Sequence, residues 1–586
     1  GGEKRVERKQ ENYFTAKMMR RQLVPSLISA LGLAFGDIVD ALVVGRQMGV
    51  TGLAAISLTL PVFMVINVVM HGFGIGGSVR YAMLLAKGKK KEAVEEFQGI
   101  LLTAGLLGIG LALAGNLFLP QILSLLGTVP EDGILYEAAG TYAGIILGGI
   151  PLFFLAYISN YYLRNDDCQR LAGVGFTIGN LSDIGLNFLL VWGLDLGVAG
   201  AAWATLAGQA VSIGCYLTVY WKKNRCLRLF PFTPRFQTCF SSFRAGFASS
   251  SQYLYSMLFL LTANRVLMEK TGSLGPAVLD LVQNASFFLL YLYEGTARAA
   301  QPVISTYTGE KDEEGRRRVR KNALFFGSLT GLCGILLVAF FPRQVCALFG
   351  MKEAGEAGVY ALQVYCTGAG IAGINLLLES YEQACGREKG AFVMTTLRGA
   401  AVLLPVTAFF SFFPLEGFWW LFPVTEVISL FLFLIWKKNR GKEQALVTDP
   451  ERVLRRTFGS SREELSRFLT ETEVFCERWG ASWKQSYFVN LTVEELCAVI
   501  MEKGFKKEKG YIQVTLISEP DGDFQLYIRD GAIAFNPFSL EGKKLKAGEQ
   551  ADGTEVDAMG VLIVRQKAKE FFYRRYQGFN TLIVRI

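Results

Sequence analysis

The first 440 residues contain one apolar unit that occurs twice. The basic loop GKKKE that begins at Gly88 recurs as GEKDE at Gly309, an offset of 221 residues, and the segment around Gly200 recurs around Gly417, an offset of 217. Each copy holds six apolar stretches of about 20 residues, the length that a helix needs to cross about 30 Å of hydrocarbon. Duplication of such a unit is typical of secondary transporters, whose two similar halves move about a central site.

The composition indicates a membrane protein. Hydrophobic residues occupy 51% of the 586 positions and the mean hydropathy is +0.31, which is too apolar for a soluble protein. The 63 glycines fit close packing of helices in lipid. We therefore predict an all-α membrane protein with twelve transmembrane helices in two six-helix lobes, followed by a soluble α+β sandwich domain. The apolar stretches are centred near Val39, Val65, Leu106, Leu147, Ile178, Ala207, Leu258, Leu289, Leu329, Gly370, Leu403 and Leu430.

Loop charges predict the orientation, because Lys and Arg next to a span resist translocation. The N-terminal arm and every second loop are basic, whereas the alternating loops carry few positive charges. Both termini are therefore expected in the cytoplasm of a multi-pass protein of the plasma membrane. The predicted domains are an N-terminal arm (1–21), an N-lobe (22–225), a C-lobe (226–440), a linker (441–450) and a cytoplasmic tail domain (451–586).

The net charge of +9 belongs to the membrane half, since residues 441–586 hold 22 Lys+Arg and 22 Asp+Glu. Basic loops are expected beside anionic lipid, so this charge gives no support for nucleic-acid binding. The ten cysteines include no CxxC pair and no closely spaced Cys/His cluster, so neither a disulfide framework nor a metal site is indicated. His71, the single histidine, lies in a glycine-rich segment, and we expect it to pack between helices through a hydrogen bond rather than to relay protons.

Two acidic residues interrupt the first apolar segment. Asp37 and Asp40 are three residues apart, which places them on one face of a helix. A carboxylate in the middle of a bilayer costs about 2.5–3.5 kcal/mol, so the pair needs either protonation or a polar cavity. Intramembrane ionisable groups usually mark ion or proton pathways, although neutral carboxyls can also tie helices together.

The membrane half resembles the multidrug and toxic compound extrusion (MATE) family over about residues 15–440. The resemblance is carried by VDALVVGRQMGVTGLAAISLTLP, GFGIGGSVRYAMLLAKGKKKEA, NLSDIGLNFLLVWGLDLGVAGAAWAT and, in the second copy, AAQPVISTYTGEKDEEGRRRV. It implies a coupling-cation site in the N-lobe that includes Asp40 and Thr205. The family pattern of Asn, three residues and Asp appears here exchanged, as Asp183 and Asn187, and Asp37 is an additional acid.

The resemblance implies a cation-coupled antiporter that needs no cofactor. A carbonyl and carboxylate cage would suit Na⁺, whereas clustered acids favour H⁺, and we favour H⁺. Acids and aromatic residues of the second copy are candidates for a substrate cavity, where rings can bind an organic cation, although an aromatic run also fits helix packing. These candidates are Tyr255, Phe287, Tyr291, Asp280 and Glu294.

The tail reads as an α+β sandwich. Alternating patterns predict a strand and a helix in 458–479, a helix over 489–503, a hairpin of strands 511–518 and 524–530, a helix over 560–572 and a strand over 580–586. The order resembles anti-sigma-factor kinases of the histidine-kinase-like ATPases, carried by NLTVEELCAVIMEKGF, YIRDGAIAFNPF and the segment from DAMGVLIVRQ to the last strand.

This second resemblance implies nucleotide-binding candidates Glu495, Asp530, Asn536 and Gly560, with Glu495 at the general-base position. The position of the Mg²⁺-binding Asn is Val499, and alanines replace glycines at Ala532 and Ala558. Loss of the metal ligand removes a main electrostatic contribution to phosphoryl transfer. We therefore expect a degenerate domain that binds ATP or ADP weakly, or binds a regulatory protein, or acts only as a structural cap.

Together these features predict a monomeric, cation-coupled exporter of small amphipathic or cationic organic compounds with a cytoplasmic regulatory domain. One alternative is a membrane-anchored signalling protein whose tail binds an anti-anti-sigma-like partner. A second alternative is a flippase for a lipid precursor or a peptide.

Overall fold

The computed structural model describes residues 2–86, 90–165, 169–220, 227–229, 231–351, 355–385, 387–440, 450–505, 509–539, 553–576 and 579–586. Helices of the first copy are α1 (Gly2–Ala86), α2 (Lys90–Leu117), α3 (Leu119–Leu126), α4 (Ile134–Gly148), α5 (Ile150–Asn165), α6 (Gln169–Asn187) and α7 (Gly197–Tyr220). Those of the second are α8 (Cys239–Thr271), α9 (Leu274–Gly309), α10 (Glu313–Phe340), α11 (Pro342–Leu348), α12 (Gly355–Ala384), α13 (Glu388–Thr396), α14 (Leu403–Phe410), α15 (Leu415–Phe418) and α16 (Leu421–Arg440).

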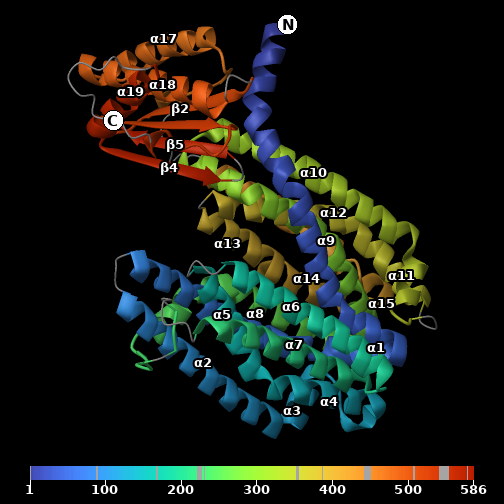
Figure 1. The fold of residues 1–586 in the computed structure, drawn as a ribbon. Coiled ribbons are helices and arrows are strands. Elements are labelled where there is room, and N and C mark those ends of the chain that lie inside the picture. Colours follow the sequence, from blue (N-terminus) through green and yellow to red (C-terminus); the bar gives the residue numbers. More distant parts are fainter. Residues whose placement is uncertain are drawn as a thin grey trace.

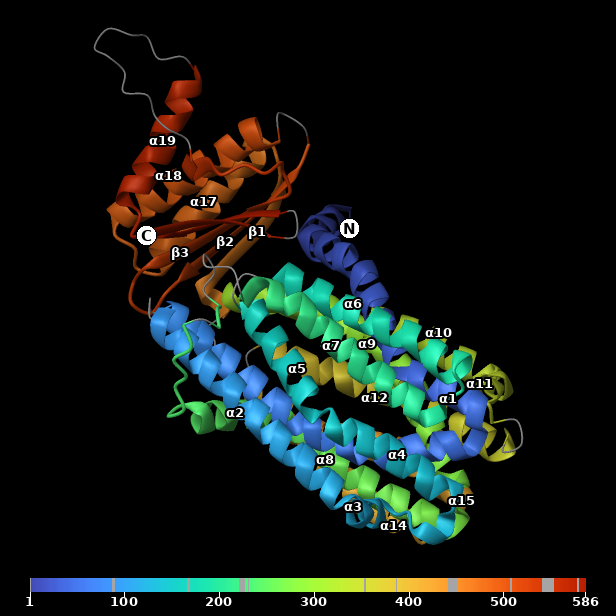
Figure 2. The ribbon, with the colours of Figure 1, turned by 60° about the horizontal axis from the view of Figure 1, so that its bottom comes forward.

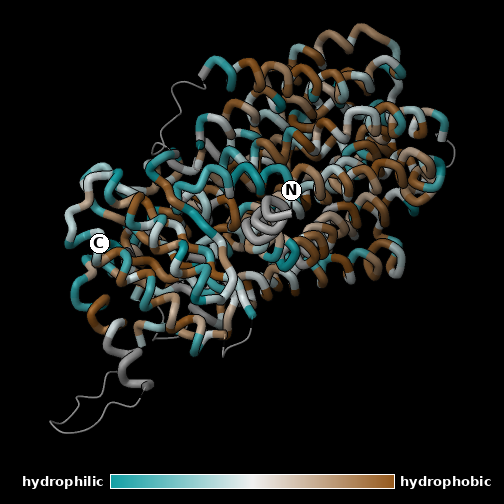
Figure 3. Tube along the Cα trace, turned by 90° about the horizontal axis from the view of Figure 1, so that it is seen from above, coloured by the Kyte–Doolittle hydropathy of each residue, from teal (hydrophilic) through white to brown (hydrophobic). Residues whose placement is uncertain are grey.

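The helical bundle confirms the predicted membrane fold. All twelve predicted segment centres lie on helices, and the bundle is mostly hydrophobic along its trace, in contrast to the tail (Figure 3). Within the described residues, nine helices are long and apolar enough to cross a membrane, or ten if the bent pair α4 and α5 forms one span. Helix α1 holds the first two predicted segments, separated at Gly49, where φ is 60°. Residues with a side chain rarely adopt this backbone conformation, so glycine provides the turn.

The membrane half contains two widened helical turns in its described residues. A π-helical turn, η2 (Phe188–Gly193), directly follows α6, and another, η3 (Leu397–Ala401), separates α13 from α14. Such turns are rare and often occur at functional sites because they redirect side chains and free backbone groups. A short 3₁₀ turn, η1 (Pro130–Asp132), links α3 to α4.

The tail is a five-stranded antiparallel sheet with helices on one face. The strands are β1 (Val453–Gly459), β2 (Tyr511–Ser518), β3 (Phe524–Asp530), β4 (Glu570–Tyr576) and β5 (Phe579–Arg585), in the order β1-β2-β3-β5-β4. The helices are α17 (Arg462–Arg478), α18 (Trp483–Val499) and α19 (Gly553–Lys567), and short turns are η4 (Pro450–Arg452), η5 (Ile500–Gly504) and η6 (Pro537–Ser539).

The predicted helix over 560–572 is wrong at its end. Helix α19 stops at Lys567, and Glu570 begins the edge strand β4, which pairs with β5. The backbone groups of β4 form their hydrogen bonds with β5, the next strand in the chain, instead of within a longer helix. The hairpin of β2 and β3 has the predicted bounds.

The start of α1 and the tail lie at the same end of the bundle (Figure 1). Helices α17 to α19 form the outer layer of the tail, and the sheet lies between them and the bundle (Figure 2). The first turns of α1 therefore pass beside the sheet before the helix enters the bundle.

Candidate functional site

Asp40 lies at the meeting point of four helices of the first lobe. Its Oδ1 accepts a 2.7 Å hydrogen bond from Asn187 Nδ2 on α6, and its Oδ2 accepts one of 3.1 Å from Thr205 Oγ1 on α7. The hydroxyl of Tyr142 on α4 donates to Oδ2 over 3.4 Å. Three donors thus converge on one carboxylate, and we call Asp40, Tyr142, Asp183, Asn187 and Thr205 the acid cluster.

The Asn187 amide joins two carboxylates of the acid cluster. Its Nδ2 also donates to Asp183 Oδ1 over 3.0 Å, one helical turn earlier on α6. Asn187 is fully buried, and no donor within the described part of the chain reaches its Oδ1. A buried amide oxygen without a donor is costly. The cluster therefore holds an acceptor that a cation or a protonated carboxyl can satisfy.

The structure brings together Asp40, Asp183, Asn187 and Thr205, as the sequence predicted, and adds Tyr142. The side chain of Asp37 lies outside the described residues. Sequence reasoning missed Tyr142 because a single tyrosine in an apolar segment carries no local signal of its partners.

Asp280 occupies a related position in the second lobe. It is buried on α9, and Asn284 Nδ2 donates to its Oδ2 over 3.0 Å, at the same four-residue spacing as Asp183 and Asn187. Its helix, α9, packs along α1, which carries Asp40. The repeated spacing of Asp and Asn is a signal that would have linked Asp280 to the acid cluster rather than to the substrate cavity.

A cavity of about 540 Å³ is lined mainly by α8, α9, α12, η3 and α16 of the second lobe, and Met64 of α1 and Leu403 of α14 also line it. Phe287, Tyr291 and Glu294 line it as predicted, whereas Tyr255 and Asp280 are not among its lining residues. Tyr255 instead packs against Gly399 of η3. The volume is that of a site for a drug-sized ligand.

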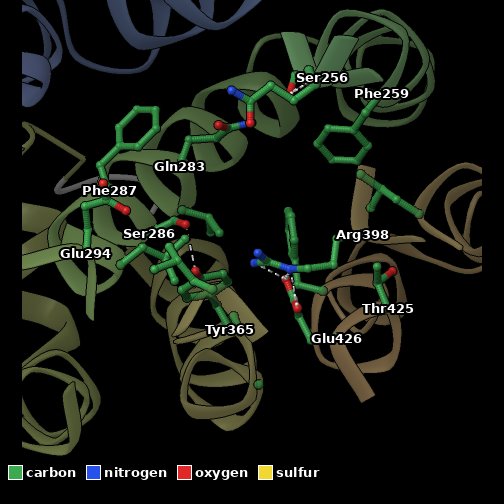
Figure 4. A pocket seen from close by; sticks show the side chains of 18 of the residues that line it. Ser256, Phe259, Gln283, Ser286, Phe287, Glu294, Tyr365, Arg398, Thr425 and Glu426 are labelled. Carbon is green, nitrogen blue, oxygen red and sulfur yellow. Dashed lines mark hydrogen bonds and ion pairs between the residues drawn. The ribbon is translucent and has the colours of Figure 1, made fainter. Parts of the chain in front are cut away.

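An ion-paired arginine reaches into this cavity (Figure 4). The guanidinium of Arg398 on η3 makes 2.9 Å contacts with both carboxylate oxygens of Glu426 on α16, and lies 3.5 Å from Glu379 on α12. Glu294 pairs separately with Arg298 at 3.0 Å. When all these groups are ionised, one negative charge remains among them. Sequence reasoning missed Arg398, whose partners lie on other helices.

His71 packs between helices, in agreement with the sequence prediction. Its Nδ1 lies 3.0 Å from the carbonyl oxygen of Asn67, and its Nε2 lies 3.2 Å from the hydroxyl of Tyr253. Both ring nitrogens therefore have partners within the bundle.

The nucleotide-binding candidates of the tail lie on α18 (Glu495), in the middle of α19 (Gly560), at the end of β3 (Asp530) and in the turn after it (Asn536). The Glu495 side chain of α18 lies against Gly560 of α19, where an added Cβ atom would lie 1.9 Å from Glu495 Oε2. Asp530 Oδ1 accepts from the Ala532 amide at 2.9 Å and from Asn580 Nδ2 at 2.8 Å.

Two further tail residues bear on nucleotide binding. Asn536 caps a turn by accepting from the Phe538 amide at 3.0 Å. Val499 is buried in the apolar core between the helices and the sheet. The side chain at the position of the expected metal ligand therefore faces the apolar core of the tail. The side chain of Ala558 lies outside the described residues.

The MatE family model matches the chain twice, over residues 25–189 and 245–409, and the histidine kinase-like ATPase domain model matches residues 458–586. The two MatE matches cover more than half of the chain, and the second begins 220 residues after the first, which confirms the duplication.

Similar curated proteins have multidrug transport names. Probable multidrug resistance protein YoeA of Bacillus subtilis is 24% identical over 439 residues, which is 71% of this chain and 93% of that protein. Multidrug export protein MepA of Staphylococcus saprophyticus is 24% identical over 426 residues, which is 70% of this chain and 91% of that protein.

A solved multidrug resistance MATE family transporter in its inward-facing conformation has the same fold, with a TM-score of 0.64 and 19% identity over 70% of this chain and 96% of that chain. The chain therefore belongs to the MatE family of multidrug efflux transporters and carries a histidine kinase-like ATPase domain after its membrane half.

Proposed function

We propose that the protein is a proton-coupled antiporter that exports small amphipathic or cationic organic compounds, with both termini in the cytoplasm. The observation that carries this proposal is the acid cluster, in which two carboxylates share one amide inside an apolar bundle. A carboxylate in hydrocarbon is stable only with a proton, a cation or compensating donors. Occupation of the cluster therefore depends on the ion available from either side of the membrane.

The donor pattern favours H⁺ over Na⁺ as the coupling ion. Asn187, Thr205 and Tyr142 all donate to Asp40, which leaves its oxygens less available to a metal ion. A protonated carboxyl can in turn donate to the Asn187 Oδ1, which lacks a donor among the described residues. Protonation thus satisfies the cluster without any further ligand.

Asp280 provides a connection to the other lobe. It is buried on α9, which packs along α1, so a charge change at Asp40 on α1 alters the interaction between these two helices. Two lobes that respond to the same charge can exchange ion and cargo alternately, as secondary transporters do.

The second-lobe cavity is the proposed cargo site. Its aromatic and apolar lining suits the body of an amphipathic compound, and the excess negative charge around Arg398 suits a cationic group. The multidrug export name of MepA is consistent with this class of cargo.

The tail is proposed as a regulatory domain that binds a nucleotide weakly without turnover. The apolar burial of Val499 and the contact of Gly560 with Glu495 support the absence of metal-dependent catalysis.

Reconstitution into liposomes tests the coupling. A lipophilic fluorescent cation is loaded, and its transport is followed under a pH gradient alone, a Na⁺ gradient alone, and neither. We expect transport under the pH gradient only. Transport driven only by Na⁺ would contradict proton coupling, and transport under neither gradient would contradict the antiporter proposal.

A further inference from the structure

The sheet of the tail has two buried faces of opposite character. Even-numbered residues of β2 and β3, such as Val514 and Ile528, face the helices and form the apolar core. Odd-numbered residues form the other face, where Gln513 and Thr515 are each only 1% exposed and Arg529 is 2% exposed. A polar sheet face of an isolated two-layer domain would be solvated. Its burial here means that the membrane half covers it.

Complementary charges meet at this interface. The Arg529 guanidinium pairs with Glu310, which follows α9, and both side chains are buried. Arg455 of β1 pairs with Asp312, the N-cap of α10, and Lys311 pairs with Glu519 at 2.6 Å. The three consecutive residues from Glu310 to Asp312 thus each pair with a tail residue of opposite charge. Burial raises the pKa of the Glu310 carboxyl, and the charge of Arg529 opposes that rise.

Residues 13–15 of α1 complete the interface. The ring of Tyr13 lies 4.6 Å from that of Tyr511, and the ring of Phe14 lies 5.5 Å from that of Phe579 at the start of β5. Phe14 is fully buried in a cluster that also includes residues of α9, α10 and α12. On the other side Thr15 bonds to the hydroxyl of Tyr307 on α9 at 2.9 Å. The segment is held between the tail and the second lobe.

Helix α1 therefore connects the tail interface to the acid cluster. It is helical without a break from this segment to Gly49, and it carries Asp40 into the first lobe. One end of the helix is fixed to the second lobe and the tail, while its middle belongs to the ion site of the first lobe. Alternating movement of the lobes has to change the packing of α1 at one of these places.

We propose that the docked tail is an inhibitory clamp, which holds the start of α1 against the second lobe and so slows the exchange between lobe arrangements. This inference rests on the proposed transport function. Release of the clamp frees α1 to move with the first lobe and raises the transport rate. The pairing of Arg455, Lys311 and Arg529 with partners across the interface makes docking specific for this transporter.

Adjacent arginines of β1 provide a matched test. Arg455→Ala removes an interface pair, whereas Arg456→Ala removes a pair with Glu471 inside the tail. In liposomes, we expect Arg455→Ala and Glu310→Gln to raise the initial rate by roughly 2- to 30-fold, the range of typical couplings between distant sites. We expect Arg456→Ala to match the wild type. Glu310→Arg alone should also raise the rate. The double variant Glu310→Arg with Arg529→Glu restores an ion pair with exchanged charges, so its rate should return toward that of the wild type.

Covalent fixation tests the same clamp in the opposite direction. The double variant Tyr13→Cys with Tyr511→Cys, joined by a short cleavable cross-linker with two thiol-reactive groups, should transport more slowly than before treatment and recover after cleavage. Treated single variants serve as controls. Unchanged transport in the cross-linked protein, or equal rates for Arg455→Ala, Arg456→Ala and the wild type, would overturn the clamp. Gradient-driven transport by the wild type tests the proposed function separately.

Discussion

At the scale of single residues, the acid cluster depends on one amide that serves two carboxylates. Asn187 donates to Asp40 and Asp183 at once, which holds the carboxylates of α1 and α6 on the same side of the amide. A carboxamide and a carboxylate of similar shape can exchange places in such a pair, provided that the total charge of the cluster stays the same.

The exchange of Asp183 and Asn187 tests this relationship. Asp183→Asn removes one charge and Asn187→Asp adds one, so each single variant should lose most gradient-driven transport. The double variant restores the total charge and should regain part of the transport activity, because the effects of substitutions at residues that share a site are not additive. Initial transport rates in liposomes give the double-mutant cycle. Additive losses in log rate would show that the two residues do not share an ion.

Arg398 illustrates a residue whose role is structural as well as electrostatic. Arg398→Gln leaves Glu379 and Glu426 buried beside each other without a cation. Removal of one partner of a buried pair typically costs about 3–5 kcal/mol. We expect a clear loss of thermal stability in detergent, measured by tryptophan fluorescence. Arg298→Gln is the control, since its pair with Glu294 is partly exposed and such pairs contribute about 0–1 kcal/mol.

At the scale of elements, the tail helices determine what the tail can bind. Val499 is on the core side of α18, and Gly560 of α19 lies directly against Glu495. A metal-bound nucleotide would need a polar ligand where Val499 is buried and space where the two helices touch.

The tail should therefore bind ATP weakly and hydrolyse none measurably, with little effect of Mg²⁺. Titration calorimetry on the full-length protein in detergent measures this. Val499→Asn places an amide in an apolar core, so a thermal melt must accompany it; a folded variant should gain a Mg²⁺ effect. Tight Mg²⁺-dependent binding by the unaltered protein, or steady turnover, would contradict the degenerate site.

The sequence predicted the elements that have a regular hydrophobic pattern of their own. The twelve apolar segments and the β2–β3 hairpin follow directly from hydrophobic spacing. The edge strand β4 was missed because its partner β5, and not its own pattern, determines its conformation. Arg398 and Tyr142 were missed for the same reason, since their partners are distant in the chain. The polar face of the sheet reads as a solvated face, so nothing in the sequence indicated that the bundle covers it.

At the scale of the whole molecule, α1 unites three parts of the protein. Residues 13–15 contact the tail and the second lobe, and Asp40 lies in the acid cluster of the first lobe. The duplication provides two lobes with the same order of helices, but only the first has the full acid cluster and only the second contacts the tail through its α9–α10 loop within the described residues. In our proposal, the first lobe binds the ion and the second lobe receives the regulatory contact from the tail.

Cargo-driven proton movement in liposomes tests the central claim most directly. An imposed gradient of a lipophilic cation should drive protons in the opposite direction, reported by a trapped pH dye. Asp40→Asn should abolish this proton movement while the protein stays folded, because the amide keeps the shape of the side chain but cannot exchange a proton. Asp195→Asn, which alters a carboxylate outside the acid cluster, is the control and should behave as the wild type. Full proton movement by Asp40→Asn would contradict the account.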